Sequence, residues 1–231
     1  MIKLYQFPPV FGRNVSPFTL KLETWLKLAG LPYQVVALRN PGQGPKGKLP
    51  FIEDDDGSFI ADSSLIIEHL SRSRGIDLDA ALGPGERAQA LALQRLFEDH
   101  LYFVLAWSRW LDPEGWRSFG PALFHGIPPP LRQAISAFLR RRLRGDLRAQ
   151  GLGRHSQAEI YAMGRADLEA IAVLLGERPF FFGTQPTTID AIAYGFLANI
   201  VLVPIETELE RIARGLPALV AWTETMERRL S

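Results

Sequence analysis

Cysteine is absent from this sequence of 231 residues. Its absence excludes a disulfide scaffold, a thiolate metal site and a cysteine nucleophile. Redox chemistry would therefore need a bound cofactor. The absence does not identify the cellular compartment.

A strong net charge is also missing. The chain has 26 Lys and Arg against 25 Asp and Glu, a formal net charge of +1. This balance provides no overall attraction to nucleic acid or to an acidic membrane, so any basic surface must be local. One predicted helix carries such a surface, with leucines on one stripe and arginines on the rest: Leu139, Leu143 and Leu147 against Arg140, Arg141, Arg142, Arg144 and Arg148. We interpret it as a solvated face and expect no nucleic-acid partner, because no aromatic residues are interleaved; a nucleic-acid or membrane-surface patch is the less favoured alternative.

Long apolar runs are lacking too. The longest, from Ala191 to Ile205, is interrupted by Asn199 and Pro204. It falls short of the roughly 20 residues that cross a bilayer, so it predicts a buried helix and no transmembrane segment. The start at Met1 shows no basic leader or cleavage site, and we expect a cytoplasmic protein.

Metal-ligand patterns are missing among the histidines. His69, His100, His125 and His155 are scattered, without a His-x-x-x-His or Glu-x-x-His spacing. We therefore expect no metal site.

A compact ββα unit is predicted for the residues from Lys46 to Leu70. An Asp-Gly turn at Asp56-Gly57 separates two short apolar runs, which is a strong hairpin signal. Asp62 and Ser63 then offer side-chain oxygens to the free N–H groups of an apolar helix. A helix start of this kind also favours anions.

The preceding residues predict a β-α-β unit. Ile2–Phe7 and Tyr33–Leu38 suit strands, and Ser16-Pro17 suits the start of a helix that ends at Gly30. After residue 85 the chain is predicted to be almost entirely helical, with a break at 112–130 where proline and glycine are frequent. The order β-α-β then β-β-α is that of the thioredoxin-like fold.

The whole chain resembles the glutathione transferase superfamily. The resemblance implies an α/β thioredoxin-like N-terminal domain at 1–76, a linker at 77–85 and an all-α C-terminal domain at 86–231. Two stretches are similar to the branch that includes metaxins and failed-axon-connections proteins: Ser16–Thr24 and Gly153–Tyr161. Members of that branch commonly carry cysteine where this chain has Thr19, which argues against thiol chemistry at that turn.

The resemblance implies a binding site for glutathione. Asp62 and Ser63 match the pair that holds the γ-glutamyl end, and Leu49 matches the residue whose backbone pairs with the cysteinyl unit. Pro50 is expected in cis, and Lys48 stands where a cation often meets the glycine carboxylate.

Ser16 matches the catalytic hydroxyl of serine-type members. It would donate a hydrogen bond to the glutathione thiolate, whose thiol has a reference pKa near 8.5 and is mostly protonated at neutral pH. A plain N-cap explains a serine before proline equally well, and this alternative stays open. Tyr5 is interpreted as a core residue, because Gln6 takes the register used by tyrosine-type members.

Two further pairs have predicted roles. Thr187 and Asp190 stand at capping spacing and are interpreted as a structural cap of the next helix. Trp107 and Trp110 lie where the superfamily has its second, hydrophobic substrate site, although packing in the core would explain them as well.

These features predict a glutathione transferase that activates the glutathione thiol for attack on a small hydrophobic electrophile. The alternative is a non-catalytic adaptor with the same fold, as the metaxin resemblance implies. A homodimer is expected from the superfamily alone. Fold by itself does not choose between an enzyme and an adaptor.

Overall fold

The computed structural model describes residues 1–230. The chain forms two compact units. Unit 1 contains Met1–Gln94, Glu177–Asn199 and the chain from Trp222 onward, and unit 2 contains Arg95–Gly176 and Ile200–Ala221. A thioredoxin-like sheet with helices is followed by a helical region, as the sequence predicts.

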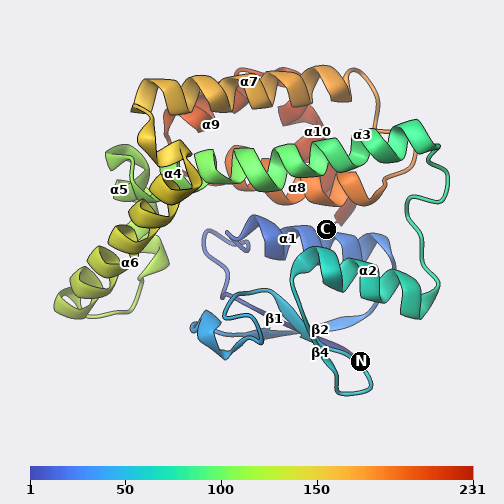
Figure 1. The fold of residues 1–231 in the computed structure, drawn as a ribbon, viewed down its shortest axis with the longest axis horizontal. Helices are drawn as coiled ribbons and strands as arrows, with labels where there is room; N and C mark the ends of the chain where they lie inside the picture. The colour runs from blue at the N-terminus through green and yellow to red at the C-terminus, as the bar shows by residue number, and fades with distance from the viewer. Residues whose placement is uncertain (231) are drawn as a thin grey trace. The chain divides into compact units, whose positions relative to one another are not determined.

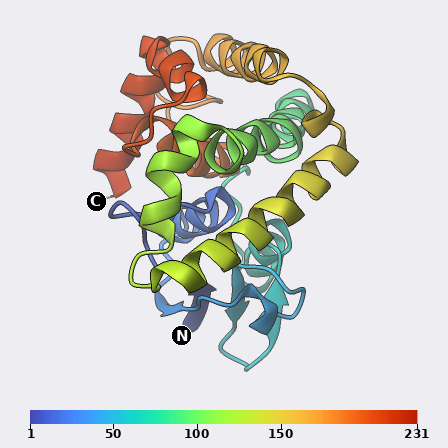
Figure 2. The same cartoon turned by 90° about the vertical axis from the view of Figure 1, so that its left-hand side faces the viewer.

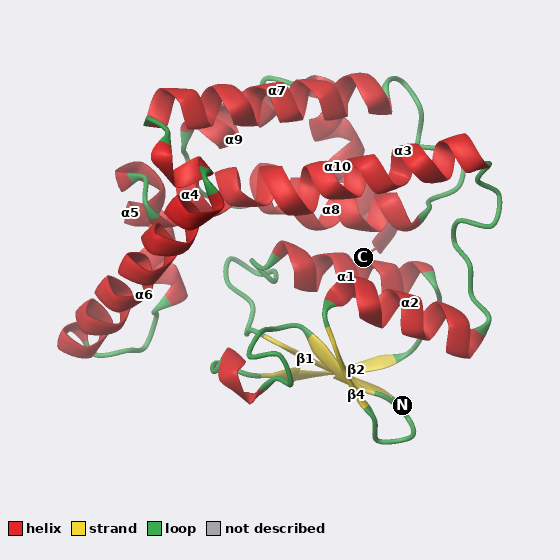
Figure 3. Ribbon diagram, viewed as in Figure 1, coloured by secondary structure: helices red, strands yellow, loops and turns green. Residues whose placement is uncertain are grey.

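A sheet of four strands forms the base of unit 1 (Figure 3). The strands are β1 (Ile2–Gln6), β2 (Tyr33–Ala37), β3 (Phe51–Glu53) and β4 (Phe59–Ala61). Their order is β2-β1-β3-β4. β2 is parallel to β1, while β3 is antiparallel to both β1 and β4. The predicted β-α-β and hairpin units therefore share one sheet.

Helices α1 (Pro17–Leu28) and α2 (Ser63–Arg74) cover one face of this sheet (Figure 1). Side chains alternate along a strand, so every second residue of β1 faces the helices. The resulting core contains Ile2, Leu4, Leu22, Trp25, Leu26, Ile52, Ile66, Ile67 and Leu70. The opposite face carries a smaller cluster of Leu49, Phe51 and Ala61, next to the loop that contains η1 (Pro41–Gln43).

Unit 1 also includes most of α3 (Pro84–Arg95), α8 (Thr188–Val201) and α10 (Pro217–Leu230). Helix α8 approaches the first turn of α1 closely at Gly195. A Cβ atom there would lie 2.6 Å from the carbonyl oxygen of Pro17 and 2.7 Å from the nitrogen of Lys21. Only glycine permits this contact, which fixes the start of α1.

Unit 2 is helical. Its elements are η2 (Leu96–Leu101, a π-helical turn), α4 (Tyr102–Trp110), α5 (Pro113–Leu123), α6 (Pro129–Gln150), η3 (Leu152–Arg154), α7 (Gln157–Leu175) and α9 (Glu208–Arg214). Helix α6 is the long yellow-green helix of Figure 2. No helix within residues 1–230 is both long and apolar enough to cross a membrane.

The break predicted at 112–130 is wrong, because α5 occupies most of it. Asp112 caps this helix by accepting the N–H of Glu114 at 2.7 Å, and Pro113 takes the first position. Glycine in this helix permits close packing against a neighbouring segment. A Cβ on Gly115 would lie 2.0 Å from the carbonyl oxygen of Ser108.

Candidate functional site

The predicted Leu49-Pro50 pair and the Asp62-Ser63 pair lie beside each other at one edge of the sheet. The Leu49–Pro50 peptide is cis, as expected. Phe51 pairs with Ala61 in the antiparallel ladder, so the residues just before β3 lie next to those just after β4. Tyr5 pairs with Phe51, which brings the end of β1 to the same edge.

Asp62 starts α2 in an unusual backbone conformation. Its φ is 86°, a left-handed value that costs a non-glycine residue about 1–3 kcal/mol. The side chain is exposed, and its Oδ1 accepts the N–H groups of Ser64 at 3.0 Å and Leu65 at 3.3 Å. Strain of this size persists where the surrounding structure imposes it, and it is frequent at ligand sites.

Ser63 is the first residue of α2 and is buried. Its N–H has no acceptor within the helix, as for every first-turn residue. Directly behind it, the Ser64 hydroxyl accepts hydrogen bonds from Lys21 Nζ at 2.7 Å and from Gln94 Nε2 at 3.0 Å. The sequence reading missed this network, which places a buried lysine of α1 at the start of α2.

Leu49 presents its main chain rather than its side chain. The side chain is buried in the small cluster with Phe51 and Ala61. Neither its N–H nor its C=O is hydrogen-bonded to another residue within 1–230. Both groups can therefore pair with an extended peptide beside the edge.

Ser16 caps α1, but weakly. Its Oγ accepts the N–H of Thr19 at 3.4 Å, a long hydrogen bond, and the side chain is half-buried. No acceptor among the described residues takes its hydroxyl proton. The hydroxyl can therefore donate a hydrogen bond to a bound group while it still caps the helix.

Asn14 holds Ser16 near the edge. Its Oδ1 accepts the N–H of Ser16 at 3.0 Å, and its Nδ2 donates to the carbonyl oxygen of Phe7, just after β1, at 2.9 Å. The carbonyl oxygen of Asn14 in turn accepts from Asn199 Nδ2 at 3.2 Å. Sequence reasoning missed this residue, although an asparagine two positions before a helix cap is a local hydrogen-bonding signal.

Lys48 is exposed and forms no hydrogen bond or ion pair with another described residue. Gly44, in the loop before it, approaches the main chain of Lys48 closely. A Cβ there would lie 2.6 Å from the carbonyl oxygen of Lys48. Tyr5 stacks on Phe51 at a ring distance of 4.4 Å and donates to Glu53 Oε2 at 2.8 Å. Its side chain is half-buried against the smaller cluster, so Tyr5 packs on the outer face of the sheet and not in the main core predicted for it.

The other predicted residues lie in packed surroundings. Thr187 and Asp190 are buried at the start of α8, where Asp190 accepts from Thr187 N and Oγ1, each at 2.8 Å, and from Phe181 N at 3.0 Å. Burial raises the pKa of Asp190, although these hydrogen bonds oppose the shift. In unit 2, Trp107 meets Tyr161 edge-on at 5.5 Å, and Trp110 stacks on Trp116 at 5.7 Å.

A cavity of about 390 Å³ lies elsewhere in unit 1. Gln6, Glu23 and Tyr194 are among its lining residues, whereas Ser16, Leu49, Pro50, Asp62 and Ser63 are not. Burial raises the pKa of Glu23. Asn14, which holds Ser16, also lines this cavity.

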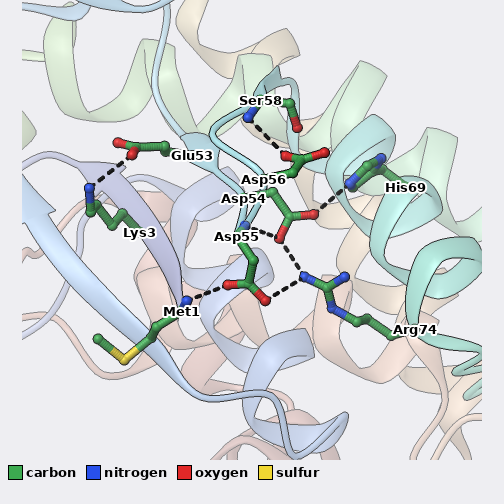
Figure 4. A network of polar contacts seen from close by, with 9 residues as sticks. All are labelled: Met1, Lys3, Glu53, Asp54, Asp55, Asp56, Ser58, His69 and Arg74. Carbon is green, nitrogen blue, oxygen red and sulfur yellow. Dashed lines mark hydrogen bonds and ion pairs between the residues drawn. The ribbon is translucent and has the colours of Figure 1, made fainter.

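Titratable side chains gather at the opposite end of β3 and β4 (Figure 4). Asp54 is buried and contacts His69 Nε2 at 2.8 Å and Arg74 at 2.5 Å. Burial acts to raise the pKa of Asp54, but the hydrogen bond from His69 and the charge of Arg74 outweigh it and lower the pKa. Within residues 1–230, no group of three or more His, Asp or Glu residues could hold a metal ion.

Comparison with known families assigns the class. Residues 17–115 match the family model described as the glutathione S-transferase N-terminal domain, and residues 164–226 match the glutathione S-transferase C-terminal domain. The chain belongs to the glutathione S-transferase family. The predicted resemblance is thus confirmed.

The relatives include a named glutathione S-transferase and proteins with other names. Isoprene-epoxide–glutathione S-transferase of Rhodococcus sp. (strain AD45) is 35% identical, with 99% of each chain covered. Failed axon connections of Drosophila melanogaster is 36% identical over 87% of this chain and 50% of its own length. Mouse Metaxin-1 is 27% identical over 90% of this chain and 68% of its own.

Among solved structures, a glutathione S-transferase of Ceriporiopsis subvermispora in complex with glutathione has a TM-score of 0.64. It is 21% identical, and the match covers 98% of this chain and 97% of that one. At this identity the likeness supports the fold alone.

Proposed function

We propose that this chain is a serine-type glutathione transferase. It binds glutathione along the sheet edge and activates the thiol for attack on a small hydrophobic electrophile. One observation supports the proposal: the uncommitted hydroxyl of Ser16 is tied through Asn14 to the end of β1, and strand pairing brings that end next to the free main chain of Leu49 and the strained start of α2 at Asp62.

Each part of glutathione has a matching group in this proposal. The γ-glutamyl carboxylate accepts from the N–H and hydroxyl of Ser63 at the positive end of α2, and Asp62 takes the ammonium group. The main chain of Leu49 pairs with the cysteinyl unit, beside cis-Pro50. Lys48 meets the glycine carboxylate.

Ser16 stabilises the thiolate in the proposed reaction. Its hydroxyl and the N-terminus of α1 favour the charged form and so lower the thiol pKa from its reference near 8.5. The thiolate then attacks an electrophilic carbon and forms a C–S bond. The name of the Rhodococcus relative suggests an epoxide, in which a C–O bond breaks and the alkoxide takes a proton from water.

Further parts of the proposal rest on the family. Trp107 and Trp110 contribute to the site of the hydrophobic substrate, and the protein acts in the cytoplasm. The protein forms a homodimer, as expected from the superfamily. Light scattering at micromolar protein tests the dimer, and a monomer mass would refute it.

Calorimetric titration with glutathione tests binding. Asp62→Ala should weaken affinity about tenfold, because it removes a charged hydrogen-bond partner. Asp56→Ala is the matched control, since Asp56 also accepts a backbone N–H, from Ser58 at 2.9 Å, but lies in the hairpin turn. Equal affinities for the two variants, or no heat with the unmodified protein at millimolar ligand, would refute this site.

The second candidate is a non-catalytic adaptor, favoured by the identity to failed axon connections. An adaptor need not bind glutathione or turn over an electrophile. Absence of both glutathione binding and turnover would support the adaptor.

A further inference from the structure

Positive charge is concentrated in one part of unit 2. Residues 115–158 contain eight arginines and no lysine, and Asp146 is their one acidic residue. Since the whole chain has a formal net charge of +1, the remainder is net negative. This segregation produces a local positive field that the total charge conceals.

Helix α6 carries most of these arginines. One side of the helix faces unit 2 through half-buried or buried Ile135, Leu139, Leu143 and Leu147. The solvent side is not uniformly polar. Phe138 is 65% exposed and Leu131 is 55% exposed, and seven residues apart they lie on the same stripe of the helix. Ala134 lies between them on that stripe.

Arginines flank this apolar stripe on both sides. At 100° per residue, Arg142 lies on one side, and Arg141, Arg144 and Arg148 lie on the other. All four are exposed, and none forms an ion pair with another residue in the described part of the chain. Their charges therefore remain available to an external partner.

Arg140 behaves differently from these four and anchors the helix. Its Nε donates to the carbonyl oxygen of Trp110 at 2.7 Å, and its guanidinium lies 4.6 Å from the ring centre of Trp116. Burial, followed by the charge of Arg144, lowers the pKa of Arg140. The guanidinium groups of Arg140 and Arg144 are thus close enough to repel one another, and Asp146 is the one acidic residue of α6.

We propose that the solvent side of α6 is a docking surface for an anionic phospholipid bilayer. Phe138 and Leu131 enter the boundary between headgroups and acyl chains, and the flanking arginines contact the acidic headgroups. A helix with exposed large apolar residues between basic ones has the composition of an interfacial helix. Nucleic acid would use the charges but would leave Phe138 in water, so the apolar stripe favours lipid.

Vesicle flotation tests this surface on the full-length protein. With vesicles of phosphatidylcholine and about 30 mol % phosphatidylglycerol, the protein should float at low salt and be released at about 0.5 M salt. It should not float with phosphatidylcholine alone. The surface shares no residue with the candidate glutathione site, so flotation does not depend on the proposed transferase function.

Three variants and two matched controls separate the contributions. Arg141→Gln/Arg142→Gln should weaken vesicle binding at least tenfold, since each basic residue near an anionic surface contributes about fivefold. Arg39→Gln/Lys46→Gln, which removes two exposed charges that are likewise without an ion pair among the described residues but lie in unit 1, should change it less than twofold. Phe138→Ser should weaken binding about tenfold, while Val173→Ser, which removes a side chain that is 80% exposed, should not. Phe138→Leu should restore most of the binding.

Three results would overturn the proposal. The first is equal binding to neutral and anionic vesicles. The second is no binding to anionic vesicles at low salt. The third is that the arginine variant loses vesicle binding while Phe138→Ser does not. If the protein then also binds a double-stranded oligonucleotide, the partner of this surface is recognised by charge alone.

Discussion

The two ends of strands β3 and β4 differ in how their polar groups are satisfied. At the hairpin turn, Asp54 is buried and both of its carboxylate oxygens have partners, and the neighbouring Asp55 pairs with Arg74 and the Met1 ammonium group (Figure 4). At the other end, the main chain of Leu49 has no partner among residues 1–230. The same two strands thus have one saturated end and one open end.

This difference separates structural polar groups from ligand-binding ones. A buried polar group without a hydrogen-bond partner destabilises the folded state. A cluster in which every buried group has a partner within the protein therefore indicates a role in stability. Main-chain groups without a hydrogen-bond partner at an accessible edge, next to the strained backbone of Asp62, destabilise the fold and gain no compensating contact within the protein. We therefore expect changes at the turn to affect stability and changes at the edge to affect binding and turnover.

The largest loss of stability is expected for Asp54→Ala. It leaves Arg74 and His69 without their shared partner and should lower the free energy of unfolding by about 2–3 kcal/mol. Asp56→Ala, in the same turn but exposed, should cost much less. Urea denaturation followed by circular dichroism measures both. A similar loss in the two variants would show that the saturated network is not what stabilises the turn.

A second prediction concerns acid. Because the pKa of Asp54 is lowered in the folded state, its contribution is present above its unfolded pKa near 3.8 and is lost as pH falls through the folded value. The stability difference between the unmodified protein and Asp54→Asn should shrink as pH falls below about 4. A difference that stays constant from neutral pH to pH 3 would contradict this sign.

Local sequence signals suffice to predict the individual elements of this site. The way these elements come together depends on contacts between residues far apart in the sequence. The proline at the head of a strand, the Asp-Gly turn and the capped helix starts each occupy a few consecutive residues, and the structure contains all of them. The role of Asn14 depends on Phe7 and Asn199, and that of Gly195 depends on Pro17. The spacing of residues in a single sequence does not predict contacts of this kind.

The failure at 112–130 has a related cause. Frequent proline and glycine predict a break between helices, but Pro113 occupies the first turn of α5, where its missing N–H is tolerated. Gly115 is required because Ser108 lies too close for a side chain. The frequency of proline and glycine in a segment does not show whether an individual proline starts a helix or an individual glycine permits a close contact.

An intermediate effect is expected for Asn14→Ala. The variant leaves the Ser16 N–H and the Phe7 carbonyl oxygen without their partner, so the free energy of unfolding should fall by about 1–2 kcal/mol. Turnover should also fall, because Ser16 is no longer held at the edge. Asn40→Ala is the control, since Asn40 also accepts a backbone N–H, from Gly42 at 2.9 Å, but in an exposed loop. Unchanged turnover in Asn14→Ala would make Asn14 purely structural.

The smallest change in stability, and the sharpest test of the comparison, is expected for Ser16→Ala. Its capping hydrogen bond to Thr19 is 3.4 Å long, so the loss should stay within about 1 kcal/mol. Turnover with a chromogenic electrophile should fall at least about tenfold, because a donor to the thiolate is removed. Glutathione affinity should remain within a few-fold, and the apparent thiol pKa should rise toward about 8.5.

Ser156→Ala is the control for this variant, because Ser156 caps α7 with a bond of the same length, 3.4 Å, to the N–H of Glu159. The Ser156 hydroxyl also donates to Glu159 Oε2 at 2.8 Å, so Ser156→Ala should lose at least as much stability as Ser16→Ala. If both serines are only caps, neither variant loses turnover. If Ser16 belongs to the open edge, only Ser16→Ala loses turnover and shifts the pH profile. The first result would leave glutathione binding intact and remove the argument for serine-type catalysis.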